Sequence, residues 1–249
     1  MIEFETALSR AKEQNRNSIG VQKERLLHAF LKYYLEPDPI YHERPVAGFV
    51  ADVFRDSEAI EVQTRDLYRL CRKLEAFLEN PDVEQVNVVF PIATTKWLIW
   101  VDEDGLCRPR RKSPKAGSPL QILPELYPLR ALIQDGRLMF TVVMLQIEEY
   151  RYLDGWSRDK KRGSHRMERV PLAMDAMISL QAPADYLALL PPDLPSQFSV
   201  KEFGKPCRMR QKAAWRTLHV LTLLGVVRKC GKRGRSDLYQ VNFNCGTAD

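Results

Sequence analysis

Three polar side chains interrupt two short apolar segments near residue 50, and their types suit hydrolytic chemistry. Asp52 lies in the segment GFVADVF, and Glu61 and Gln63 lie in the segment IEVQT, on either side of Val62. Residues two apart on a strand share a face, so Glu61 and Gln63 are expected on one face and Val62 on the other. If the two segments pair as a hairpin, Asp52 comes alongside Glu61. Such a carboxylate pair suits Mg²⁺ or Mn²⁺, and the metal can polarise a phosphodiester and lower the pKa of a bound water.

The first hundred residues show a simple alternation of helical and strand patterns that would position these side chains. Apolar residues at helical spacing predict two helices, and short β-rich or continuous apolar runs predict five strands. The expected order is a helix at 18–35, strands at 40–45, 46–54 and 59–64, a helix at 66–78, and strands at 86–92 and 96–101. The alternative for Asp52 and Glu61 is a solvated face of an ordinary sheet, but an unpaired carboxylate in so apolar a strand is costly.

Residues 102–182 carry weaker signals. Residues 108–115 predict a basic, proline-containing loop, and residues 120–133 predict a helix interrupted near its two prolines. A long strand is expected at 137–152 and an exposed loop at 154–166. A change of composition near residue 183 predicts two domains, 1–182 and 183–249.

The order αβββαβ, with an aspartate followed by a Glu-x-Gln strand, resembles the PD-(D/E)XK nuclease superfamily, which includes restriction endonucleases and archaeal Holliday-junction resolvases. The resemblance covers residues 18–101. It implies an α/β, restriction-endonuclease-like core with a mixed central sheet. It also implies that Asp52 and Glu61 are catalytic and hold Mg²⁺ or Mn²⁺, joined by Glu24 from the first helix.

The third residue of the family motif is usually a lysine, which steadies the nucleophilic water and the charge of the transition state. Here it is Gln63, as in some members of the family, so Gln63 is expected to orient the water. Lys73 on the following helix and Lys96 are two lysines that the fold could bring to the site instead. The glutamine also keeps open an alternative function, a catalytically inactive, nuclease-like DNA-binding or regulatory protein.

Positive charge is concentrated at the C-terminus. Residues 196–245 carry eleven Lys or Arg against two acids, a net charge of +9, which leaves −3 of the whole chain's +6 to the rest. A basic patch confined to one small domain is the electrostatic footprint of a polyanion binder. A solvated basic face kept for solubility is the alternative.

Residues 183–249 resemble a winged helix-turn-helix domain. Ser199 is a suitable N-cap for its second helix, and Gly225 is a suitable stop for its third. The expected elements are helices at 185–190, from 200 onward and at 209–224, and a hairpin of 226–230 with 238–241. Trp215 is expected in the core of this domain.

Seven cationic side chains of this domain are the expected nucleic-acid contacts. Those on the third helix would face the major groove, and those at the tip of the hairpin would reach phosphates or the minor groove. They are Arg208, Arg210, Lys212 and Arg216 on the helix, and Lys232, Arg233 and Arg235 at the tip. A winged helix also serves protein contacts in some proteins, which is the alternative here.

The sequence therefore predicts a metal-dependent DNA nuclease, an endodeoxyribonuclease that a basic winged helix directs to duplex or branched DNA. An RNA-processing enzyme on the same scaffold is a further alternative. Nucleases that cut both strands are often dimers, which leaves a homodimer open, although the sequence shows no coiled-coil heptad or obvious interface. No apolar run approaches the ~20 residues of a membrane span. The polar N-terminus lacks the pattern of a secretory signal. Five dispersed cysteines without a CxxC pair argue against a disulfide framework or a zinc ribbon, so a cytoplasmic location without membrane contact is expected.

Overall fold

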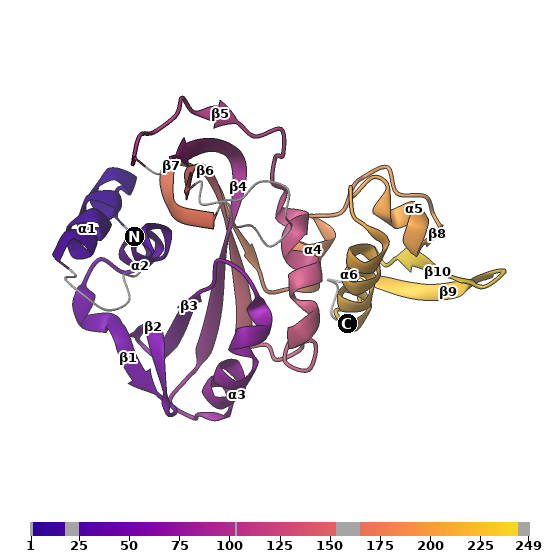
Figure 1. Cartoon of the computed structure of the whole chain (residues 1–249). Coiled ribbons are helices and arrows are strands. Elements are labelled where there is room, and N and C mark those ends of the chain that lie inside the picture. The colour runs from indigo at the N-terminus through magenta and orange to yellow at the C-terminus, as the bar shows by residue number, and fades with distance from the viewer. Residues whose placement is uncertain (1, 18–24, 103, 153–164, 244–249) are drawn as a thin grey trace.

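A mixed, strongly twisted β-sheet organises most of the chain (Figure 1). The structure is a computed structural model that describes residues 2–17, 25–102, 104–152 and 165–243. The sheet order is β1-β2-β3-β4-β6-β7, with β5 paired to β4; β3–β4 and β4–β6 are parallel and the other pairs antiparallel. Its strands are β1 His42–Val46, β2 Phe49–Arg55, β3 Glu58–Val62, β4 Gln85–Val101, β5 Arg111–Lys112, β6 Leu138–Tyr152 and β7 His165–Leu180. The predicted α/β architecture with a mixed central sheet is therefore confirmed.

Two-residue turns join the first three strands. Ala47 and Gly48 link β1 to β2, and Asp56 and Ser57 link β2 to β3, all four with positive φ. Positive φ at both central residues is the turn conformation whose twist matches that of paired strands. These turns place β1, β2 and β3 side by side and pair the C-terminal part of β2 with β3.

Helices cover both faces of the sheet (Figure 1). α1 and α2 pack on one face, where they share a buried apolar cluster with Val89 and Leu145. α3 and the 3₁₀ segment η3 lie on the other face, in a cluster that includes Val88 and Phe90. The bounds of these and the remaining helical segments are α1 Phe4–Asn17, α2 Leu26–Leu35, η1 Pro39–Tyr41, η2 Leu67–Leu70, α3 Cys71–Glu79, η3 Pro119–Glu125 and η4 Tyr127–Leu129. Because successive residues of β4 point to opposite faces, its continuous apolar run is buried on both, as predicted.

The C-terminal module, residues 183–243, combines three helices with a three-stranded sheet of order β8-β10-β9. Ser199 Oγ accepts a hydrogen bond from the Glu202 N–H at 3.3 Å, and the Glu202 carboxylate accepts one from the Ser199 N–H at 2.8 Å, so the predicted N-cap is confirmed. Gly225, with φ 72°, ends the third helix as predicted. The elements are α4 Pro183–Leu187, β8 Phe198–Ser199, α5 Val200–Gly204, α6 Gln211–Leu223, β9 Val227–Arg233 and β10 Ser236–Val241.

The C-terminal module packs directly on the sheet domain through α6. The ring of Tyr127 in η4 lies 5.2 Å from the rings of both Trp215 and His219, and the Arg216 guanidinium lies 5.5 Å from the same ring. One buried apolar cluster continues from the sheet domain into the module. The prediction that Trp215 is a core residue is wrong: 43% of it is exposed, because its partner is the rim of the neighbouring domain.

Several element predictions need correction. β4 is one strand and not two, because a bulge between Ala93 and Thr95 breaks the alternation of side chains without ending the strand. β7 was not predicted; Pro171 obscures its pattern but is tolerated on the edge strand of a sheet. α1 was also not predicted, and residues 119–129 form 3₁₀ turns where an interrupted helix was expected.

Two predictions fall on residues that the structure does not describe. Glu24 and most of the predicted loop at 154–166 belong to this part of the chain. Among the described helices, none combines the length and apolar character needed to cross a lipid bilayer.

Candidate functional site

Asp52 and Glu61 form a carboxylate pair where the β2–β3 ladder opens. The last backbone pair of that ladder at this end is Val53 with Ile60, so Asp52 lies opposite Glu61. The Val62 N–H donates to Asp52 Oδ2 at 2.7 Å, and the Asp52 N–H donates to Glu61 Oε1 at 3.2 Å. Each carboxylate therefore accepts from the backbone of the neighbouring strand, which holds both side chains side by side.

Two cationic or ionisable groups from separate helices complete this site. Lys73 Nζ, on α3, donates to Glu61 Oε2 at 2.5 Å. His28 Nε2, on α2, lies 3.2 Å from Asp52 Oδ2. The carboxylate pair is thus held between a helix on each face of the sheet.

The two carboxyl groups differ strongly in acidity. Burial raises the pKa of Glu61 to about 7, the neighbouring Asp52 charge adds to this, and Lys73 opposes it only in part. Burial also acts to raise the pKa of Asp52, but the hydrogen bond and charge of His28 and the Val62 N–H outweigh it and lower that pKa. Like charges held this close ionise one after the other. At neutral pH Asp52 is therefore ionised, while Glu61 is protonated in a part of the molecules and ionised in the others.

The chemistry of these donors fits a divalent cation. The site places two carboxylates in contact, and one of them retains a proton near neutral pH because Lys73 and His28 do not balance both charges. Hard cations such as Mg²⁺ take carboxylate oxygens and typically keep several waters. Within the described residues no three or more His, Cys, Asp or Glu side chains are arranged to hold a metal ion. A metal ion at this site would therefore rest on two carboxylates, Asp52 and Glu61, with water completing its coordination.

The other residues expected at this site lie elsewhere. The Gln63 amide donates to the carbonyls of Arg65 (2.5 Å) and Asp66 (3.3 Å), so it stabilises the turn after β3. Lys96 Nζ lies 3.7 Å from Glu149, in a different cluster. Of the two lysines considered as replacements for the motif lysine, Lys73 is the one beside the carboxylate pair.

Lys96 belongs to a cationic cluster around one buried carboxylate. Glu149 is fully buried, and its oxygens lie 2.8 Å from Arg151 Nε, 3.2 Å from Arg166 Nε and 3.3 Å from Arg169 Nε. Burial alone would raise the pKa of Glu149, but these guanidinium groups and Lys96 lower it to about 2. Among the described residues of this cluster, four cations thus face one carboxylate, so their positive charge is only partly compensated.

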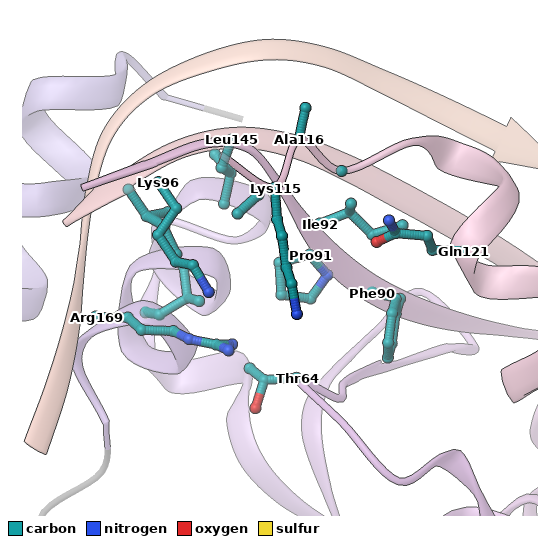
Figure 2. A pocket seen from close by; sticks show the side chains of 14 residues that line it. Thr64, Phe90, Pro91, Ile92, Lys96, Lys115, Ala116, Gln121, Leu145 and Arg169 are labelled. Carbon is teal, nitrogen blue, oxygen red and sulfur yellow. The ribbon is translucent and has the colours of Figure 1, made fainter. Parts of the chain in front are cut away.

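A pocket of about 250 Å³ opens beside this cluster. Figure 2 shows the nitrogen-bearing ends of Lys96, Lys115 and Arg169 turned toward the same space, with Thr64 at its edge. We call this cavity the basic pocket. Two of its lining residues are close in sequence to the carboxylate site: Leu27 precedes His28 on α2, and Thr64 follows Glu61 by three residues.

The cationic side chains predicted in the C-terminal module have different surroundings. On the β9–β10 hairpin, Arg233 Nη1 pairs with Glu202 Oε1 at 2.8 Å, while Lys232 and Arg235 at its end are exposed. Arg216 is half-buried over Tyr127. The three remaining helix-associated residues, Arg208, Arg210 and Lys212, are exposed.

Sequence reasoning missed His28, Lys115, Glu149 and Arg169. A signal exists for His28: α2 is apolar except for a stripe at four-residue spacing, His28, Lys32 and Glu36, and such spacing marks one face of a helix. Lys32 pairs with Glu43 at 2.9 Å and Glu36 pairs with Arg55, so this stripe faces β1 and β2. The members of the Glu149 cluster and the basic pocket come from distant segments and carry no comparable local pattern.

Comparison with known proteins places this chain in a family. The chain belongs to the family described as a domain of unknown function (DUF8091), with a match over residues 25–181 that runs from the start of α2 to the end of β7. It is also similar to an uncharacterized protein of Treponema pallidum (strain Nichols), with 29% identity over 229 residues, which cover 90% of this chain and 87% of that protein. That coverage extends the similarity into the C-terminal module. No solved structure matches the chain significantly.

Proposed function

We propose that the protein is a metal-dependent DNA nuclease. The observation that carries the proposal is the contact of Asp52 on β2, Glu61 on β3 and Lys73 on α3, with a Lys73–Glu61 distance of 2.5 Å. This combination of two acids and a lysine resembles the catalytic group of PD-(D/E)XK nucleases, with the lysine supplied by the helix after β3. The order of the strands and their mixed pairing support the same resemblance.

Each residue has a distinct task in this proposal. Asp52 and Glu61 would hold Mg²⁺ or Mn²⁺, which would supply polarisation of the phosphodiester and a lowered pKa of a bound water. Lys73 would place its ammonium group close to where negative charge develops on the phosphoryl oxygens. His28 keeps Asp52 ionised and oriented. The water oxygen would bond to phosphorus as the bond to the leaving oxygen breaks, with the proton lost by the water passing to solvent and the leaving oxygen taking up a proton from solvent.

The C-terminal module would direct the nuclease to DNA. Its element order of α4, β8, α5, α6 and a β9–β10 hairpin, with β8 pairing to β10, resembles a winged helix-turn-helix domain. The hairpin projects away from the sheet domain (Figure 1). One face of α6 packs on Tyr127. The cations at the N-terminal end of α6 and at the hairpin tip remain exposed, which supports contact with DNA.

Cleavage assays with the purified chain test the catalytic proposal. Linear, circular, branched and single-stranded DNA are incubated with Mg²⁺ or Mn²⁺, and wild type is compared with Asp52→Ala and Lys73→Met. Both variants should lose cleavage by about 100-fold or more, because they remove a metal ligand and a transition-state charge. Gln63→Ala is the matched control, and it should keep most of the activity because its amide bonds the following turn.

Two results would count against this function. Cleavage that survives in Asp52→Ala would assign the activity to another site or to a contaminant. If wild type binds duplex DNA but cuts no substrate, the alternative of a catalytically inactive, nuclease-like DNA-binding protein holds. Calorimetry with Mn²⁺ separates these cases further, since an active site should bind the ion in an Asp52-dependent manner.

A further inference from the structure

The basic pocket concentrates positive charge that exceeds the negative charge of the described carboxylate it contacts. Glu149 is the carboxylate in contact with Lys96 and Arg169, and it also compensates Arg151 and Arg166. Lys115 then adds a further cation from the loop between β5 and η3. Like charges held together in a partly desolvated cavity repel one another strongly. An anion in the pocket would relieve this repulsion.

The buried carboxylate also fixes the geometry of the cavity. Lys96 and Arg169 are anchored to Glu149 at 3.7 and 3.3 Å, yet about a fifth of each side chain stays exposed. Gly117, at the end of the loop that carries Lys115, is bonded through its N–H to the Ala93 carbonyl at 2.8 Å. Cations whose positions are set before a ligand arrives bind it with a smaller entropic cost.

The basic pocket lies next to the carboxylate pair. Thr64 lines the pocket and is three residues after Glu61, a distance of at most about 10 Å between Cα atoms. Leu27 also lines it and precedes His28, which contacts Asp52. Since charges along one DNA strand repeat every ~3.4 Å of helix axis, this separation corresponds to a few nucleotides.

We propose that the basic pocket binds a phosphate group of the nucleic-acid strand whose nearby phosphodiester lies at the carboxylate pair. The proposal rests on the proposed function, because it takes the strand at the carboxylate pair as its starting point. Paired lysine and arginine side chains are the usual ligands of phosphate oxygens. The phosphate belongs either to a strand end or to the interior of the strand, since both present the same oxygens to the pocket.

Binding assays with a matched pair of lysine variants test the pocket. Fluorescence anisotropy in EDTA measures the affinity of the full chain for a labelled duplex, so that neither metal nor cleavage is needed. Lys115→Ala should weaken binding about tenfold, because one charged hydrogen bond to phosphate is lost, and lower the slope of log K against log salt by about 1. Lys112→Ala is the control: it is an exposed lysine of the same loop region, on β5, and does not line the pocket.

Three duplexes separate the two sources of the phosphate. They carry 5′-phosphate ends, 5′-hydroxyl ends, or ends closed by hairpin loops. A Lys115→Ala effect confined to the first duplex supports a terminal phosphate, and an equal effect on all three supports an internal one. If Lys115→Ala and Lys112→Ala bind all three duplexes alike, the pocket does not hold phosphate and the proposal is wrong.

The same assays keep this proposal distinct from the catalytic one. If Lys115→Ala weakens binding but no substrate is cut, the proposal of a phosphate pocket stands and the proposal of a nuclease is wrong. Asp52-dependent cleavage with no Lys115 effect would retain the nuclease and remove the pocket.

Discussion

At the residue scale, Glu61 makes the free energy of unfolding depend on pH, because its pKa is raised only in the folded state. Its ordinary pKa of 4.5 is raised to about 7 by burial and by Asp52. An acid whose pKa is raised on folding contributes stability below its unfolded pKa, and that contribution is lost as the pH rises through the folded pKa. Asp52 changes in the opposite direction, so its own titration falls below this window.

We therefore expect the free energy of unfolding of the wild type, measured in EDTA, to fall between pH 4.5 and about 7 relative to Glu61→Gln. The difference should reach about 3 kcal/mol at neutral pH and above, on the scale of 1.36 kcal/mol per pKa unit. Urea unfolding followed by circular dichroism at several pH values measures it. Glu58→Gln, at the start of the same strand, removes a carboxylate that is not beside Asp52 and is the control. A Glu61→Gln difference that is constant with pH would contradict the raised pKa.

At the scale of elements, the strands and loops determine the positions of the functional side chains. The turn between β2 and β3 sets the register in which Asp52 lies opposite Glu61. The packing of Leu74 and Phe77 in the core holds α3 in place, and this positions Lys73 beside Glu61. The loop before η3 is a less obvious case. It approaches β4 closely at Gly117, where a methyl group would overlap the Ala93 carbonyl and the Ile92 side chain.

Gly117→Ala should consequently destabilise the protein by about 1–3 kcal/mol, because the loop must move away from β4 to admit the methyl group. The displaced loop carries Lys115, so the variant should also weaken binding of duplex DNA. Thermal unfolding and anisotropy measure the two effects. Gly136→Ala is the matched control, since no heavy atom lies within 4 Å of the added methyl group and its stability should change little. Equal stability of the two variants would show that the loop does not approach β4 as described.

At the scale of the whole molecule, charge is distributed unevenly. The net +9 of residues 196–245 is offset by −3 in the remainder, and α1 lies on the side of the sheet away from the C-terminal module (Figure 1). Glu202 and Asp237 pair with Arg233 and Lys229, so two hairpin cations are partly neutralised. Lys232 and Arg235 are also exposed at the hairpin end, beside Arg233.

Replacing both Lys232 and Arg235 by alanine should weaken binding to duplex DNA about tenfold at moderate salt and lower the salt slope by about 2, because two phosphate contacts are lost. Anisotropy titrations over a range of salt concentrations, run in parallel on DNA and RNA duplexes, measure this. Lys12→Ala, an exposed cation on α1, is the control and should bind as wild type does. An unchanged slope would exclude the hairpin from the nucleic-acid surface, and a stronger effect on RNA would favour the RNA-processing alternative.

Elements that depend on neighbouring residues could be predicted from the sequence. The alternation around Asp52, the helical stripe of α3, the cap at Ser199 and the stop at Gly225 each depend on residues within a few positions, and the structure contains all four. The sequence was misleading where tertiary contacts override a local signal. The bulge in β4 and Pro171 in β7 interrupt a pattern but not a strand, because neighbouring strands supply the pairing.

The residues alone predict the α/β class, the adjacency of Asp52 and Glu61, and the concentration of positive charge in the C-terminal module; the mixed sheet was implied by the family resemblance. Tertiary packing was needed to show that Lys73 and not Gln63 or Lys96 contacts Glu61, that His28 contacts Asp52, and that Lys96, Lys115 and Arg169 share one pocket. The physical reason is range. Strand alternation and turn conformation are set by neighbouring residues, whereas these side chains come from segments far apart in sequence and meet only when the sheet has acquired its register and twist and the helices have packed on its faces.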